Sequence, residues 1–162
     1  MVEGDEVAID KVKKYLESID EIDRLMEFKE STATVEEAAK AIGCEPGNIA
    51  KTISLLVDDK PILILLAGDV KIDNRKFKDT FKTRPKMIPI DEVENYIGHA
   101  VGGVCPFAVN EGVPIYLDES LKRFEQVYPA AGNEHSCVKL QLAELENFIK
   151  SAGWIDVSKL KL

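Results

Sequence analysis

The sequence has few cysteines, no zinc-type ligand spacing and no long apolar run. Its three cysteines, Cys44, Cys105 and Cys137, are too few and too far apart to form a disulfide framework. None lies in a C-x-x-C pattern typical of zinc sites, and no spacing typical of a nucleotide cofactor occurs. The longest apolar run, residues 62–68, has the length of a strand, whereas a membrane-spanning helix needs about 20 residues. We therefore expect no metal, no cofactor and no membrane segment.

A secretion signal is also lacking. The first ten residues, MVEGDEVAID, have neither the basic start nor the apolar segment of a signal peptide. Free thiols agree with a reducing compartment, so we expect a cytoplasmic protein. Hydrophobic residues make up 45% of the 162 residues, a proportion typical of globular proteins. Because there is no repeat or low-complexity linker, residues 1–162 are predicted to form a single domain. The oligomeric state is left open.

The net charge of −8 argues against a nucleic-acid partner, but the charge is unevenly distributed. Residues 71–86 hold seven basic and two acidic side chains. Because salt screens each charge beyond about 8 Å under physiological conditions, a basic segment in an acidic protein can still meet phosphate. The alternative is an ordinary helix face in contact with water.

Apolar periodicity and end signals predict several helices. Apolar residues recur at helical spacing from 7 to 28, which indicates an N-terminal amphipathic helix. Thr34 and Glu37 form a capping box, and Gly43 supplies the stop of a short second helix. The other helices are expected at 73–81, capped by Asp73, at 91–98 and at 142–153, the last followed by a short tail at 154–157.

The strands predict the fold class. They are expected at 53–57, 62–68, 113–118, 126–129 and 136–142. Strands outnumber crossover helices, and short turns join several of them. This pattern favours an α/β fold of the α+β type, with a mixed, largely antiparallel curled sheet surrounded by helices.

Three junctions between these elements are candidates for a site, in the stretches IAKTISLLV, GHAVGGVCPFA and PAAGNEHS. Lys51 stands at the entrance of the first strand, where its ammonium would lie at a strand end, and binding clefts are common there. Gly102 and Gly103 lie in the stretch GHAVGGVCPFA and would let backbone N–H groups converge on a carbonyl or phosphate oxygen. The alternatives are a surface lysine and a plain bend between strands.

The order of several motifs resembles the YbaK/EbsC family. The stretches TVEEAAKAIG, IAKTISLLV, ILILLAGD, IGHAVGGVCPF, GVPIYLDESL and PAAG carry the resemblance, which covers about residues 34–140. The family includes free-standing aminoacyl-tRNA deacylases, related to the editing domain inserted in bacterial prolyl-tRNA synthetases. The resemblance implies a mixed sheet with surrounding helices, and hydrolysis of the ester that joins a wrong amino acid to the 3′ end of a tRNA. The implied partners are an aminoacylated tRNA 3′ end and an aminoacyl-tRNA synthetase.

The resemblance also assigns roles to residues. Lys51 matches the family lysine, and it would hold the terminal phosphate or the ribose. The loop from Gly102 to Pro106 matches the family's pocket loop, and we expect the amides of Gly102, Gly103 and Val104 to stabilise the oxyanion. Other substrate contacts are expected at Cys105, Pro106, Phe107, Ala131 and Gly132. The candidate tRNA-contacting residues of the basic segment are Lys71, Arg75, Lys76 and Lys78.

The sequence departs from the family pattern after Gly132. Some members carry arginine, glycine and an acidic residue there, whereas this chain has Asn133 to Cys137, with a thiol in the acidic position. Ala108 stands where the family often has glycine. These departures leave the edited amino acid open, with cysteinyl- or alanyl-tRNA of the proline acceptor as the expected type.

Two other functions are compatible with the sequence. Cys105 could act as a nucleophile with His99 or His135, provided that a histidine lies within hydrogen-bond reach. Alternatively, the pocket could bind tRNA ends or aminoacyl groups without turnover, which the altered loop after Gly132 would explain.

Overall fold

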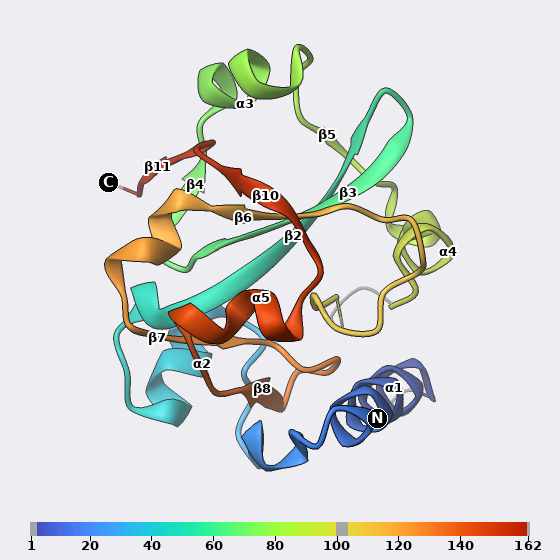
Figure 1. Cartoon of the computed structure of the whole chain (residues 1–162), viewed down its shortest axis with the longest axis vertical. Helices are drawn as coiled ribbons and strands as arrows, with labels where there is room; N and C mark the ends of the chain where they lie inside the picture. The colour runs from blue at the N-terminus through green and yellow to red at the C-terminus, as the bar shows by residue number, and fades with distance from the viewer. Residues whose placement is uncertain (1–2, 100–103, 162) are drawn as a thin grey trace.

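The computed structural model describes residues 3–99 and 104–161. Its centre is a curled, mixed seven-stranded sheet in the order β10-β6-β3-β2-β7-β9, with β5 also paired to β2 (Figure 1). The strands are β2 (Ile49–Val57), β3 (Lys60–Ala67), β5 (Lys86–Met87), β6 (Ile115–Asp118), β7 (Gln126–Pro129), β9 (Leu140–Gln141) and β10 (Ser151–Ile155). The expected fold class is confirmed: β2 runs antiparallel to β3, β5 runs antiparallel to β2, and β7 runs parallel to β2.

The β2–β3 hairpin forms the core of this sheet. Asp58 and Asp59 both adopt positive φ angles, 51° and 63°, as the tight turn of a two-residue hairpin requires. Beyond the turn, β3 pairs with β2 on one side and β6 on the other, and its residues from Ile62 to Ala67 are buried. A strand with neighbours on both sides and buried faces reads as a continuous apolar run, which explains the sequence ILILLA.

Helices pack around the sheet. They are α1 (Glu3–Ser18), α2 (Val35–Ile42), α3 (Asn74–Phe81), α4 (Val93–Ile97) and α5 (Leu145–Phe148). The Thr34–Glu37 capping box and the left-handed Gly43 at the end of α2 are both present, and Asp73 caps α3. Figure 1 shows α3 at the top of the molecule and α1 at the bottom. None of the helices in the described part of the chain has the length and apolarity to cross a bilayer.

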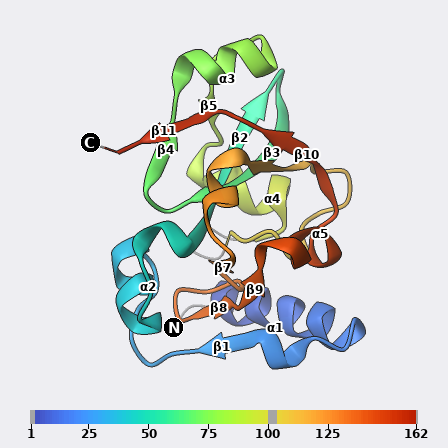
Figure 2. The same ribbon diagram turned by 60° about the vertical axis from the view of Figure 1, so that its left-hand side comes forward.

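Two short ribbons flank the sheet (Figure 2). β1 (Leu25–Glu27) pairs antiparallel with β8 (Ser136–Val138), and β4 (Val70–Ile72) pairs antiparallel with β11 (Ser158–Leu160). Each ribbon joins segments that are far apart in the sequence. The second ribbon ties the last described residues to the turn after β3.

The prediction of a helix over 7–28 is wrong beyond Ser18. Asp20 adopts a φ of 59°, and the N–H of Glu21 donates to the carbonyl of Leu16 at 2.8 Å, which ends the helix. Leu25–Glu27 then pairs with β8 as a strand. The prediction of a helix over 142–153 is also too long, because α5 ends at Phe148 and β10 takes residues 151–155, which include the first two residues of the expected tail.

Candidate functional site

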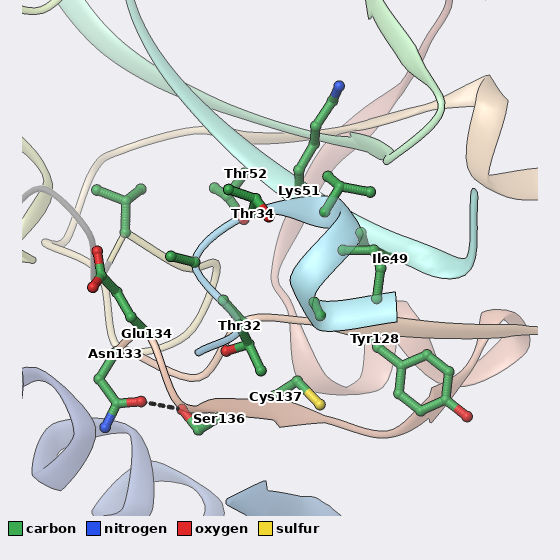
Figure 3. Close-up of a pocket in the computed structure, with 16 residues that line it drawn as sticks. Thr32, Thr34, Ile49, Lys51, Thr52, Tyr128, Asn133, Glu134, Ser136 and Cys137 are labelled. Carbon is green, nitrogen blue, oxygen red and sulfur yellow. Dashed lines mark hydrogen bonds between the residues drawn. The ribbon is translucent and has the colours of Figure 1, made fainter. Parts of the chain in front are cut away.

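A cavity of about 220 Å³ lies between the start of α2, the first half of β2, and the segment that joins β7 to β8 (Figure 3). Its described lining residues are Thr32, Ala33, Thr34, Val35, Ala38, Ile49, Ala50, Lys51, Thr52, Val104, Tyr128, Ala130, Asn133, Glu134, Ser136 and Cys137. The residues that line it therefore come from four separate parts of the chain.

Backbone hydrogen bonds hold two walls of this cavity together. The N–H of Thr32 donates to the carbonyl of Glu134 at 2.6 Å, and the N–H of Phe28 donates to the carbonyl of His135 at 2.8 Å. On the facing segment, the Ser136 hydroxyl donates to the Asn133 side-chain oxygen at 2.7 Å. The β1–β8 ribbon continues this pairing. The segment in front of α2 and the loop after Gly132 therefore form one connected wall.

Part of the cavity lining is apolar. Ile49, Ala38, Tyr128 and Cys137 belong to one buried cluster, against which Cys44 packs. Burial, the larger cause, and the neighbouring Cys44 raise the pKa of the Cys137 thiol to about 12. The side chain that replaces the family's acidic residue is therefore a neutral thiol at physiological pH, and it adds no negative charge to the cavity.

Two threonine hydroxyls line the cavity without a partner. Thr32 Oγ1 and Thr52 Oγ1 are buried, and neither makes a hydrogen bond to any residue in 3–99 or 104–161. A buried hydroxyl without a partner costs about 1–3 kcal/mol. Both hydroxyls are closed to solvent in this structure, so they are buried polar groups beside the cavity and not open binding groups.

Lys51 lines the cavity with part of its side chain, while its ammonium extends beyond it. The ammonium donates to the carbonyl of Val70, and Figure 3 shows it directed away from Thr32 and Cys137. Burial, the largest cause, and the nearby Lys161 together lower the pKa of Lys51 to about 8, while Asp69 and Glu36 act in the opposite direction. The Lys51 ammonium thus loses its proton more readily than an ordinary lysine does.

The structure brings some of the predicted site residues together. Lys51 and Val104 line the same cavity, whereas Gly102 and Gly103 lie outside the described residues. Ala131 and Gly132 are buried and do not line it, although their neighbours Ala130 and Asn133 do.

The predicted substrate contacts at Cys105, Pro106 and Phe107 are buried and are not among the cavity's lining residues. Phe107 instead stacks on Tyr15 of α1, with ring centroids 6.4 Å apart. These three side chains are therefore core residues behind the wall that Val104 forms.

Cys105 and His99 are close, yet their surroundings oppose a nucleophile. Cys105 Sγ lies 3.6 Å from His99 Nε2, and that same nitrogen lies 2.6 Å from the carbonyl oxygen of Phe107. Burial raises the pKa of the Cys105 thiol to about 12 and lowers the pKa of His99. A nucleophilic cysteine needs the opposite shift and access to substrate. The structure therefore does not favour the cysteine-hydrolase interpretation.

The basic segment lies apart from the cavity. Lys71, Arg75 and Lys78 are exposed, while the Lys76 ammonium lies 3.1 Å from the Asp156 carboxylate and donates to the Ser158 carbonyl at 2.7 Å. Figure 1 places α3 at the opposite end of the molecule from α1 and β8. A contact between this segment and a ligand therefore requires a ligand that extends well beyond the cavity.

Sequence reasoning missed Thr32, Thr52 and Tyr128 as lining residues. Thr52 directly follows Lys51 in a strand, and Thr32 lies two residues before the capping threonine of α2. Their positions next to recognised motifs are the only signal for them in the sequence.

Comparison with known proteins gives a consistent picture. The profile described as "Aminoacyl-tRNA editing domain" matches residues 29–148. An uncharacterized protein of Bacillus subtilis (strain 168), YwhH, is 47% identical over 134 residues, covering 82% of this chain and 85% of that protein. Proline–tRNA ligase of Aquifex aeolicus (strain VF5) is 31% identical over 90 residues, which are 54% of this chain and only 16% of the ligase.

A solved structure extends the likeness to nearly the whole chain. The crystal structure of a candidate trans-editing enzyme for prolyl tRNA synthetase superposes with a TM-score of 0.83 at 27% identity. The superposition covers 94% of this chain and 97% of that one. It therefore includes elements outside residues 29–148.

Proposed function

Because this chain belongs to the aminoacyl-tRNA editing domain family, we propose that it acts in trans as an aminoacyl-tRNA deacylase. It would hydrolyse the ester between a wrong amino acid and the 3′-terminal adenosine of a tRNA. The observation that carries this proposal is that Lys51 and Val104, which come from two separate motifs, line one small cavity.

The size of the cavity favours a small aminoacyl group. Its volume of about 220 Å³ lies below the roughly 300–1,000 Å³ of sites for drug-sized ligands. Part of its lining is apolar and includes the neutral Cys137 thiol. We propose that it admits alanine or cysteine attached to the proline acceptor tRNA. A separate editing site is useful for such residues, because one methylene gives a synthetase only about 1–3 kcal/mol of discrimination.

The proposed mechanism needs little from the protein, because an aminoacyl ester is already activated. The cavity orients the ester, and the backbone N–H of Val104, with those of Gly102 and Gly103, stabilises the oxyanion that forms as water attacks. The adjacent ribose hydroxyl of the substrate assists, so no protein nucleophile is required. The Lys51 ammonium outside the cavity holds a phosphate or the ribose.

The rest of the tRNA lies outside the cavity in this proposal. Lys71, Arg75, Lys76 and Lys78 would contact phosphates of the acceptor stem without reading its sequence. A prolyl-tRNA synthetase is the proposed partner that supplies mischarged tRNA, and residues 1–162 act as one domain in the cytoplasm.

Hydrolysis assays with mischarged tRNAs test the proposal. Alanyl-, cysteinyl- and seryl-tRNA of the proline acceptor are incubated with the protein, and loss of the ester is followed over time. We expect the alanyl or cysteinyl ester to be cleaved and Lys51→Ala to abolish cleavage. A protein that binds the charged tRNA and protects its ester would show a binding module instead, and the proposal would fail.

A further inference from the structure

The last strand of the fold places a second lysine beside Lys51. β11 pairs with β4 so that Leu160 lies opposite Val70, whose carbonyl accepts a hydrogen bond from the Lys51 ammonium. The ladder continues one residue further, because the N–H of Lys161 donates to the carbonyl of Asp69 at 3.1 Å. Lys161 is exposed, and its charge lies close enough to Lys51 to lower the pKa of that lysine. Lys161 and Asp69 do not belong to residues 49–52, the part of β2 that lines the cavity.

Neighbouring carboxylates do not balance the positive charges of Lys51 and Lys161. Lys161 is a cause of the lowered pKa of Lys51, whereas Asp69 and Glu36 oppose the shift. Asp69 is already engaged, because both of its carboxylate oxygens bind the Arg123 guanidinium, at 3.0 and 2.6 Å. In the described part of the chain, Glu36 on α2 is therefore the remaining acidic group that acts on Lys51. The Lys51 and Lys161 ammonium groups repel each other unless an anion lies between them.

We infer that Lys51 and Lys161 together form a binding site for a backbone phosphate at the 3′ end of an RNA. This rests on the proposed function. Lysine ammonium groups are compact point charges with several donors, which suits the oxygens of a phosphate. Lys51 connects this site to the cavity, since its side chain lines the cavity and its ammonium lies outside. If the ester of the aminoacylated RNA lies inside the cavity, the phosphate of the same RNA strand would lie outside it, on the side of the Lys51 ammonium.

RNA binding at several salt concentrations tests the site. The probe is an uncharged RNA hairpin that carries the acceptor stem and a single-stranded CCA end. Lys161→Gln should weaken its binding and reduce the slope of log K against log salt by about 0.7, the value for one phosphate contact on a single strand. The matched control is Lys60→Gln. Lys60 is also exposed, but it lies at the turn of the β2–β3 hairpin, at the other end of the hairpin from Lys51. Equal affinities and slopes for the two variants would overturn the inference.

The pH dependence supplies a second readout that loss of a structural contact alone would not change. RNA affinity should fall as the pH rises through about 8, where Lys51 loses its proton. Lys161→Gln removes a repelling charge, so the midpoint should move to higher pH, whereas Lys60→Gln should leave it in place. A midpoint that does not move in Lys161→Gln would contradict the site.

Two further arms separate the sources of failure. Direct binding of inorganic phosphate is also measured: if Lys161→Gln weakens phosphate binding but leaves RNA affinity unchanged, the site takes a free anion and the inference is overturned. If the wild type cleaves mischarged tRNA while Lys161→Gln binds RNA normally, only the inference fails. If the wild type cleaves no ester while Lys161→Gln loses RNA affinity, the proposed function fails and the phosphate site stands.

Discussion

The buried carboxylate of Asp118 joins three segments of the chain. Replacing Asp118 should therefore lower the free energy of unfolding. The residue is 0% exposed at the end of β6. Its two oxygens accept hydrogen bonds from the Ser158 hydroxyl at 2.6 Å, the Val157 N–H at 2.9 Å and the Ser120 N–H at 3.0 Å. Through these bonds β6 holds the start of β11, and β11 in turn pairs with the strand whose carbonyl binds Lys51.

Asp118→Ala leaves buried donors without an acceptor. Each such donor costs about 1–3 kcal/mol, and a hydrogen bond to a charged group is worth about 1.5–3 kcal/mol. Because the surroundings relax in part and water reaches the site, we expect the free energy of unfolding to fall by about 2–4 kcal/mol, the range of the larger single-residue effects. Urea denaturation followed by circular dichroism measures this difference with an unchanged m-value.

The control is Asp156→Ala, two residues before Ser158. The Asp156 carboxylate is exposed and pairs with the Lys76 ammonium at 3.1 Å, and an exposed pair contributes only about 0–1 kcal/mol. A loss below about 1 kcal/mol in Asp118→Ala, or an equal loss in both variants, would refute the argument that burial makes the Asp118 contacts costly to break.

Three other changes test separate parts of the structure. Cys105→Ala should leave the turnover number for mischarged tRNA unchanged, since the thiol is buried behind the cavity wall; a large loss of turnover would restore the nucleophile. Gly68→Ala should lower the free energy of unfolding by about 1–3 kcal/mol, because the added Cβ would lie 2.3 Å from the Pro46 carbonyl oxygen and 2.5 Å from a Val35 methyl; unchanged thermal stability would show that this segment shifts freely. The double variant Arg75→Gln/Lys78→Gln should reduce the salt dependence of tRNA binding, since both side chains are exposed on α3; an unchanged salt slope would remove α3 from the tRNA-binding surface.

Local signals explain what the sequence could predict of the fold. The capping box at Thr34 and the Asp73 cap each use a side chain that satisfies backbone donors a few residues away, so the helix starts are visible in the sequence. β1 and β10 are different. They are short, and their strand state depends on partners more than 30 residues distant. Their apolar residues fit helical spacing as well, and no local rule separates the two interpretations.

The sequence motifs predict part of the candidate site. Lys51 and Val104 lie in stretches that the sequence singles out, and both line the cavity. Cys105 and Phe107 belong to the same motif as Val104 but are buried in the core, and the motif itself does not distinguish the residue that lines the cavity from its buried neighbours. The unpartnered hydroxyl of Thr32 depends on a wall built by the distant Glu134 and could not be seen from sequence spacing.

The position of β10 bears on how far this domain can be shortened. The family profile ends at residue 148, yet β10 begins at Ser151 and covers the free side of β6 through a parallel ladder. A fragment cut at the profile boundary would expose the N–H and C=O groups of β6 along a strand that carries Ile115 and Leu117. Open edges of this kind recruit strands from other molecules. Such a fragment should therefore self-associate, even though it would contain every residue that lines the cavity.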